Sequence, residues 1–176
     1  MILALHGIWT KARDVSWTEK FEAFAGDCLD VRTRVYGWSS GLLSYFNWYR
    51  QYLVDCEAKY LNEVVAPVCP SIIAHSFGGY IVSQLLERGY CFDKIVLVAP
   101  AAPSDFDWAR YESQFTEVKV YWSKDDEIIG VAAYGKMGKE GPKRYHPRVE
   151  SVEVPGMKHS GYFPGYFSEW VRFFKQ

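Results

Sequence analysis

Short hydrophobic runs recur along the chain, and segments with helical spacing separate them. Residues 2–5, 71–75 and 94–99 are apolar over almost their whole length, which is typical of strands buried on both faces of a sheet. Residues 31–36 alternate between polar and apolar, which predicts a more exposed strand near a sheet edge. The full set of predicted strands is 2–5, 31–36, 71–75, 94–99, 117–122 and 149–154.

Helices are predicted from Asp14 or Ser16 to Gly26, over about 45–66, over 80–88, near Ser104 or Asp105, around 128–134 and over 165–174. Strands that alternate with helices predict a six-stranded, mostly parallel sheet flanked by helices on both faces. Residues 1–176 contain no repeat and no linker, so we expect a single domain. Residues 130–147 are rich in glycine and lysine, and beyond a short helix we expect a mobile loop there.

Composition narrows the class of partner. The formal net charge is −1 and 18% of the residues are aromatic, which favours neither a nucleic-acid-binding protein nor a disordered chain. This composition is more typical of a protein that binds a small molecule or a lipid-like partner. The length suits one domain with a substantial core. The length does not indicate an oligomeric state.

The cysteines and the N-terminus bear on location. Cys28, Cys56, Cys69 and Cys91 show no C-x-x-C spacing, so we expect reduced, mostly buried thiols rather than a disulfide framework. The first five residues are too short for a signal sequence and lack a basic lead. No other stretch approaches the length of a membrane span, so stable membrane insertion is not expected. The expected location is cytoplasmic.

The chemical signal begins where the strand at 71–75 meets the helix at 80–88. Ser76 stands between them, with Ala74 and Gly78 two positions away on either side. A serine at such a sharp turn needs small neighbours, because bulky ones would collide. An ordinary serine that caps a core helix is the alternative interpretation. The sequence Ala-His-Ser-Phe-Gly resembles the G-x-S-x-G nucleophile elbow of the α/β-hydrolase family, in the A-H-S-x-G form found in small bacterial lipases.

Two further motifs extend this resemblance in the order that the family uses, which is serine, acid, histidine. His159, in the sequence Pro-Gly-Met-Lys-His after the last strand, resembles the loop that carries the catalytic histidine. Asp126 follows the preceding strand and resembles the family's acid, because an aliphatic pair stands at the family's offset after it. Asp125 is the alternative acid. The other histidines, His6, His75 and His146, do not follow the final strand.

The resemblance also implies an oxyanion hole. Its donors would be the backbone N–H groups of Phe77, directly after the serine, and Ile8, within the His-Gly-Ile sequence that follows the first strand. We expect Trp9, Trp38 and Leu42, beside the same end of the sheet, to line an apolar acyl pocket. Phe46 and Trp48 are either part of that pocket or core residues beneath the long helix. No cofactor or metal motif is present.

Together these features predict a compact serine hydrolase without a cap domain. It would cleave small-molecule carboxylic esters or thioesters through an acyl-enzyme, with Ser76 as nucleophile, His159 as base and Asp126 as the acid that orients the base. An amidase or peptidase with the same triad is one alternative. A noncatalytic binding module on a hydrolase fold is the other.

Overall fold

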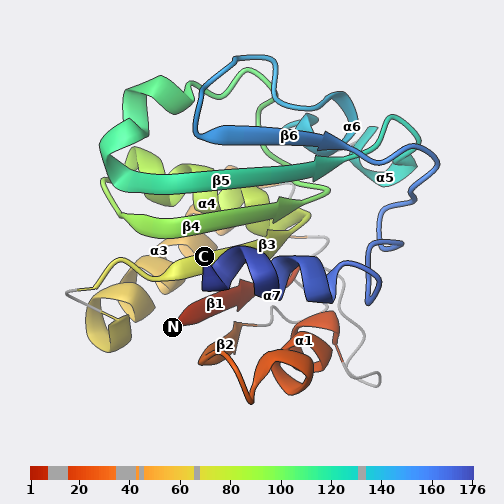
Figure 1. Cartoon of the computed structure of the whole chain (residues 1–176). Coiled ribbons are helices and arrows are strands. Elements are labelled where there is room, and N and C mark those ends of the chain that lie inside the picture. The colour runs from red at the N-terminus through yellow and green to blue at the C-terminus, as the bar shows by residue number, and fades with distance from the viewer. Residues whose placement is uncertain (8–15, 35–42, 44–45, 66–67, 131–133) are drawn as a thin grey trace.

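Six strands form one sheet in the order β2-β1-β3-β4-β5-β6. The structure is a computed structural model that describes residues 1–7, 16–34, 43, 46–65, 68–130 and 134–176 (Figure 1). The strands are β1 (Ile2–Leu5), β2 (Val31–Arg34), β3 (Ser71–His75), β4 (Phe92–Val98), β5 (Phe115–Trp122) and β6 (Val149–Glu153). All five pairings between neighbouring strands are parallel, so the predicted fold class is confirmed.

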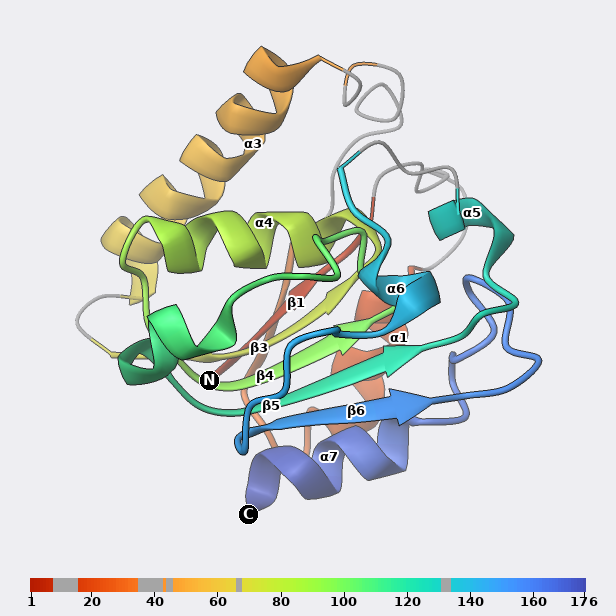
Figure 2. The same cartoon turned by 90° about the horizontal axis from the view of Figure 1, so that it is seen from above.

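Helices cover both faces of the sheet. They are α1 (Trp17–Ala25), α3 (Asn47–Tyr60) with a π-helical end η1 (Leu61–Val65), α4 (Phe77–Glu87), the 3₁₀ helix η2 (Trp108–Gln114), α5 (Glu127–Gly130), α6 (Met137–Glu140) and α7 (Phe167–Lys175). Figure 2 shows α3 and α4 on one face and α1 and α7 on the other. Among the described residues, no helix combines the length and the apolar character that a bilayer crossing needs.

The alternation of side chains along the strands divides the core in two. Leu3 and Leu5 of β1 pack with α3 and α4, whereas Ile2 and Ala4 point to the opposite face and pack with α1 and α7. Both sets are buried, which explains why the sequence of β1 is apolar throughout. The strand with alternating polarity, β2, lies at the sheet edge as predicted.

The first helix begins where its capping signal lies. Ser16 accepts a hydrogen bond from the backbone N–H of Glu19, and the Glu19 carboxylate accepts one from the backbone N–H of Ser16. This reciprocal pair satisfies two amide groups at the helix start. Ser16, and not Asp14, is therefore the cap of α1, and Asp14 lies outside the described residues.

The expectation of four reduced, mostly buried thiols is wrong. Cys69 and Cys91 form a disulfide, while Cys28 is exposed and Cys56 is half-buried, and both of these are free. Cys69 and Cys91 lie just before β3 and β4, which are parallel neighbours, so the two strands start side by side and the Cα atoms lie 5.2 Å apart. The 22-residue separation in sequence hides this proximity.

The predicted mobile loop is also corrected in part. Met137 and Gly138 donate backbone hydrogen bonds to the carbonyls of Ala102 and Pro100, which follow β4, and α6 lies within this segment. A side chain at Gly138 would lie 2.5 Å from a backbone atom of Ala99, so glycine is what permits this close contact. The basic residues here lie at the surface, with ion pairs between Lys143 and Glu140 and between Arg144 and Asp107.

Candidate active site

The turn between β3 and α4 holds Ser76 in an unusual backbone conformation. Its φ is +56° and its ψ is −119°, a region that L-residues with a side chain rarely occupy. Hydrogen bonds hold this conformation from both sides: the N–H of Ser76 donates to the carbonyl of Val98, and its carbonyl accepts from the N–H groups of Gly79 and Ala101. The serine is thus fixed by its neighbours along the chain and by the end of β4.

Small residues make this turn possible. A Cβ added to Gly78 would lie 3.2 Å from both the Ala74 and the Leu5 Cβ atoms, and one added to Gly7 would lie 2.9 Å from the Ser76 Cβ. The packing explains why alanine suffices at position 74 while glycine stands at 78. The hydroxyl of Ser76 makes no capping bond to α4, which argues against the interpretation of Ser76 as an ordinary helix cap.

Three side chains from separate parts of the chain meet at this turn. His159, in the loop after β6, has its Nε2 2.9 Å from the Oγ of Ser76 and its Nδ1 2.8 Å from Oδ2 of Asp126, which follows β5. A carboxylate only accepts hydrogen bonds, so Nδ1 carries the proton and Nε2 is left to accept from the serine hydroxyl. Ser76 is 9% exposed and Asp126 is fully buried.

Burial and hydrogen bonds distinguish Asp126 from its neighbour. Its Oδ1 accepts from the backbone N–H of Ile129 at the start of α5, while Oδ2 faces His159. Asp125 instead accepts from the backbone N–H of Gly156 at the surface, 2.7 Å away. Of the two candidate acids, the structure brings Asp126 to the histidine, and Asp125 ties the histidine's loop to the end of β5.

The candidate oxyanion donors are only partly within the described residues. Phe77 is the first residue of α4, so its N–H is among the helix-terminal amides that have no acceptor within the helix, and the helix dipole favours negative charge there. Ile8 lies outside the described residues. Gly7, which precedes it, approaches Ser76 closely, as its position relative to the Ser76 Cβ indicates.

Trp9, Trp38 and Leu42, which we predicted to line an acyl pocket, lie outside the described part of the chain. Phe46 and Trp48 are 54% and 64% exposed, so the interpretation of these two as core residues is wrong. An aromatic group beside the elbow was not predicted from the sequence. The rings of Phe77, Tyr80 and Tyr134 contact one another, and the repeated aromatic residues at 77 and 80 are the signal that could have indicated it.

Burial shapes the electrostatics around the serine. His75 is fully enclosed, and burial together with the nearby His159 lowers its pKa well below the ordinary value of 6.5. Burial also lowers the pKa of His6, although its bond to the Gly7 carbonyl and the charge of Glu19 act in the opposite direction. Burial and the charge of Asp126 raise the pKa of Tyr162. These groups are therefore neutral around pH 7.

No metal centre is indicated in the part of the chain that the structure describes, since it holds no group of three or more histidine, cysteine or acidic side chains arranged to bind an ion.

Comparison with known proteins gives a family and a set of related folds. The model of the alpha/beta hydrolase family matches residues 2–173. No curated protein matches the sequence significantly.

Several solved structures share the fold. Est1E from Butyrivibrio proteoclasticus, with ferulic acid bound, is 13% identical, with a TM-score of 0.63 over 99% of this chain and 87% of that one. The Pyrococcus furiosus esterase Pf2001 is 14% identical, with a TM-score of 0.60 over 98% and 79% of the two chains. Mouse alpha/beta hydrolase domain-containing protein 10 is 12% identical, with a TM-score of 0.61 over 99% and 87%. At these identities the likeness shows the fold alone.

Proposed function

Because the chain belongs to the alpha/beta hydrolase family, we propose that it is a serine hydrolase that cleaves carboxylic esters or thioesters. One observation carries the proposal: the Ser76 hydroxyl, the His159 imidazole and the Asp126 carboxylate form a continuous hydrogen-bonded chain, with distances of 2.9 and 2.8 Å. A nucleophile, a base and a group that orients the base are what acyl transfer needs.

The first half of the reaction forms the acyl-enzyme. The Oγ of Ser76 attacks the carbonyl carbon of the substrate while its proton passes to Nε2 of His159. The buried carboxylate of Asp126 holds the imidazole in the tautomer that can accept this proton and stabilises the imidazolium that results. His159 then gives the proton to the departing alcohol or thiol, and the acyl group stays on Ser76.

The second half releases the acid. A water molecule loses a proton to His159 and attacks the acyl carbon, and the bond to Oγ breaks as the proton returns to Ser76. In both halves the carbonyl oxygen becomes negatively charged. We assign its stabilisation to the backbone N–H groups of Phe77 and Ile8. This chemistry requires no cofactor and no metal, and we propose none.

Esters are favoured over amides because one solved structure with this fold, Pf2001 from Pyrococcus furiosus, is an esterase, and another, Est1E, holds ferulic acid. The proposed substrate is a small molecule with an apolar acyl group, bound against Trp9, Trp38 and Leu42. An amidase would use the same three side chains, so substrate comparison must separate the two. A noncatalytic binding module is the other alternative. The intact hydrogen-bonded chain disfavours it, because such a module has no need for a buried carboxylate behind a histidine.

Location in the cell is a separate proposal. A cytoplasmic protein was expected, but the Cys69–Cys91 disulfide points the other way, since such bonds persist mainly in oxidising compartments. Alkylation of free thiols in intact cells before lysis, followed by mass measurement, decides between them. A cytoplasmic protein would have all four cysteines alkylated, and a protein from an oxidising compartment would have two.

The deciding experiment for the activity is hydrolysis of p-nitrophenyl esters from acetate to laurate, alongside labelling with a fluorophosphonate probe. We expect the wild type to turn over and to be labelled, and Ser76→Ala to do neither. Ser83→Ala is the matched control, because Ser83 is a buried serine on α4 whose hydroxyl donates only to the Tyr80 carbonyl. Labelling without turnover would identify the substrate class as wrong, and absence of both would favour the binding module.

A further inference from the structure

The residue before the nucleophile contacts the loop that carries the base. His75 is the last residue of β3 and is 4% exposed. Its Nε2 lies 3.0 Å from the backbone carbonyl oxygen of His159, and the two imidazole rings are 4.6 Å apart between centroids. The two histidines stand 84 residues apart in the sequence, so this contact joins the elbow directly to the loop after β6.

The His159 loop is anchored on both sides of the histidine: the Val154 N–H donates to the Trp122 carbonyl, Tyr162 is fully buried, and the Phe163 ring stacks on Trp17. It contains no regular secondary structure between β6 and α7. Besides the Val154 bond, its described hydrogen bonds to other parts of the chain are made by the Gly156 N–H and the Lys158 ammonium, which contact Asp125 and Glu127 at the surface, and by the His159 ring itself. The His75 bond is the one among these that reaches the backbone of His159 from the strand that carries Ser76.

The hydrogen bond to the His159 carbonyl determines which ring nitrogen of His75 carries the proton. A carbonyl oxygen only accepts, so Nε2 must carry the proton and Nδ1 must be the unprotonated nitrogen. That Nδ1 is buried and has no hydrogen-bond partner among the described residues. A buried nitrogen without a partner costs free energy, and an apolar side chain would fill the same space without that cost. The one contribution that an imidazole adds here is its Nε2–H donor.

From this arrangement we propose that His75 is a positioning residue, which holds the backbone of His159 at the distance where its ring reaches both Ser76 and Asp126. The inference rests on the proposed function for its effect on catalysis, but the contact itself does not. Trp17 and Phe163 pack against the His75 ring and keep it oriented toward the loop, with centroids 6.3 and 5.1 Å from it.

Neutrality suits this role. The titratable groups that face His75 are His6 and His159, with Glu19 and Asp126 next to these in turn. During acyl transfer His159 becomes a cation beside His75, and a second cation at that distance would oppose it. Burial keeps the pKa of His75 low, so its ring donates a hydrogen bond without adding charge.

The test compares His75→Leu with His75→Gln. A leucine side chain fills the space of the imidazole but has no hydrogen-bond donor. The glutamine amide, in contrast, can donate to the His159 carbonyl. We expect the leucine variant to lose about 10- to 100-fold in kcat, because a misplacement of about 1 Å has that effect. Its KM should be unchanged, since His75 does not contact the substrate. Glutamine should recover most of the loss.

The matched control is His146→Leu. His146 is also buried, but it lies before β6, at the opposite end of the sheet, against the Phe115 ring. Its loss should lower stability and leave kcat per labelled site unchanged. Equal kcat losses in the His75→Leu and His75→Gln variants, or a change confined to KM, would overturn the proposal.

Crystal structures of both His75 variants provide a readout that does not depend on activity. In His75→Leu we expect the His159 Nε2 to move beyond hydrogen-bond distance of the Ser76 Oγ, and in His75→Gln we expect it to stay. An unmoved His159 in the leucine variant would refute the positioning role even if no ester is turned over. The two proposals can fail separately. If the wild type is neither labelled nor active, but His159 is displaced only in the leucine variant, the proposed function is refuted and the positioning role of His75 stands.

Discussion

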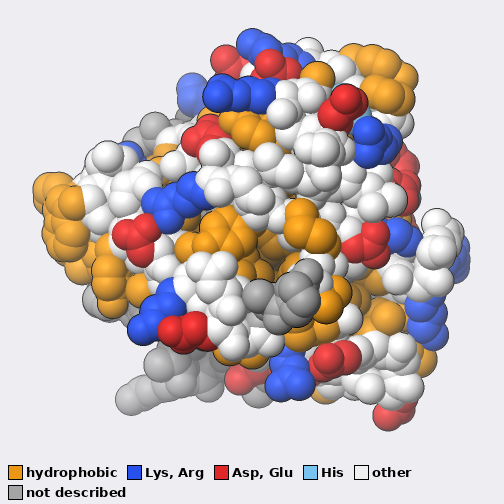
Figure 3. Space-filling model, turned by 90° about the vertical axis from the view of Figure 1, so that its left-hand side faces the viewer, with side chains coloured by type: hydrophobic (Ala, Val, Ile, Leu, Met, Phe, Trp, Pro, Cys, Tyr) orange, Lys and Arg blue, Asp and Glu red, His pale blue; other side chains and the backbone are white. Residues whose placement is uncertain are grey.

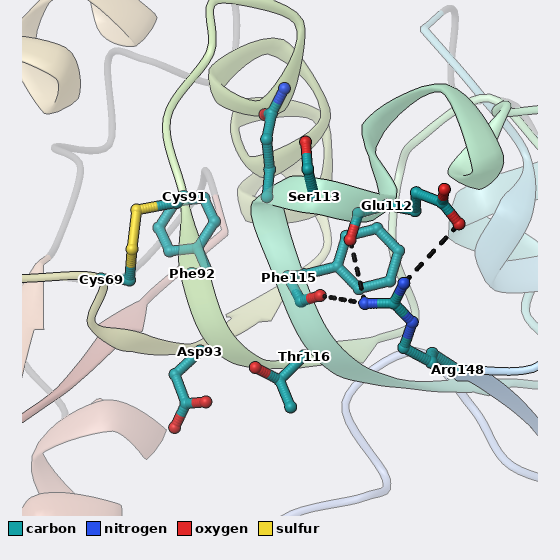
Figure 4. A pocket seen from close by; sticks show the side chains of 10 residues that line it. Cys69, Cys91, Phe92, Asp93, Glu112, Ser113, Phe115, Thr116 and Arg148 are labelled. Carbon is teal, nitrogen blue, oxygen red and sulfur yellow. Dashed lines mark hydrogen bonds and ion pairs between the residues drawn. A yellow bond between two sulfur atoms is a disulfide. The ribbon is translucent and has the colours of Figure 1, made fainter.

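The two ends of the sheet keep their residues in place by different means. At the end where the strands finish, the described residues include Ser76 and Ala99, both with positive φ and both held by close packing and hydrogen bonds. At the end where the strands begin, the Cys69–Cys91 disulfide joins two neighbouring strands, and Arg148 donates to the carbonyls of Glu112 and Phe115 (Figure 4).

One hollow of the molecule lies at the end of the sheet opposite to the proposed catalytic residues. Figure 3 views the face at which the strands begin, and hydrophobic side chains surround a hollow at its centre. A pocket of about 490 Å³ at this end is lined by the disulfide and by residues that start β4 and β5. None of the proposed catalytic side chains lines it. The proposed site is marked instead by the strained backbone of Ser76 and by buried, paired polar groups.

Stability and activity are therefore supported from opposite ends of the sheet. A covalent bond between strand starts can hold the fold without constraining the groups that react. Hydrogen bonds at the other end must hold three side chains to within tenths of an ångström, and they do so at the cost of unfavourable φ angles. Changes at the two ends should consequently have separable effects.

After the loss of turnover expected for Ser76→Ala, the largest effect is expected for Asp126→Asn, which keeps the size of the side chain and removes its charge. The amide has no negative charge to stabilise the imidazolium and can favour the wrong tautomer of His159, so we expect kcat to fall about 10³- to 10⁴-fold. Asp125→Asn is the control, because Asp125 contacts the loop backbone and not the ring. Steady-state kinetics of the two variants measure the two losses in kcat. Equal losses would show that the negative charge at this end of the sheet matters more than its position.

A smaller effect, in stability alone, is expected at the other end. Replacing Cys69 and Cys91 together by serine removes the restraint on a 22-residue loop and should lower the free energy of unfolding by about 3 kcal/mol. Urea unfolding measures this, with Cys28→Ser, an exposed free thiol, as the control. Ester hydrolysis at a temperature where both proteins are folded should be unchanged. A large loss of activity there would contradict the separation of the two ends.

The smallest expected effect is on the pH dependence of stability. Burial lowers the folded-state pKa of His75 below its ordinary value of 6.5, so the unfolded chain binds more protons than the folded one below that pH. The stabilisation is full above pH 6.5 and is lost as the pH falls below it, by up to about 1.4 kcal/mol per pH unit. Thermal unfolding between pH 5 and 8 should show a shallower slope for His75→Leu than for the wild type. Identical slopes would mean that burial does not lower the folded-state pKa of His75.

Most of the fold could be predicted from local pattern. Strands buried on both faces have continuous apolar runs, and the edge strand β2 alternates, so six strands and their parallel arrangement follow from the sequence. Helix ends were less predictable: the long helix was expected to continue to residue 66, but α3 ends at Tyr60 and passes into a π-helical turn. Ends depend on tertiary contacts that periodicity does not encode.

Contacts between distant segments were the main source of error. The disulfide was missed because the start points of β3 and β4 become neighbours only in the folded sheet. The segment around Met137 and Gly138 was expected to be mobile, because its glycines and lysines are typical of loops. In the structure those glycines allow close backbone approach to Pro100 and Ala102, and the segment is held by hydrogen bonds.

The order of serine, acid and histidine was predicted from the resemblance to the family. The sequence pattern itself specified the alternation of strands and helices and the serine at a sharp turn with small neighbours. These are local properties, because side-chain size and periodicity act over a few residues. The sequence favoured Asp126 over Asp125 as the acid, but the contact of Asp126 with the His159 ring and the donation from His75 to the His159 backbone exist only in the folded chain. Those contacts depend on how the ends of β3, β5 and β6 are placed beside one another, and that placement exists only once the whole sheet has formed.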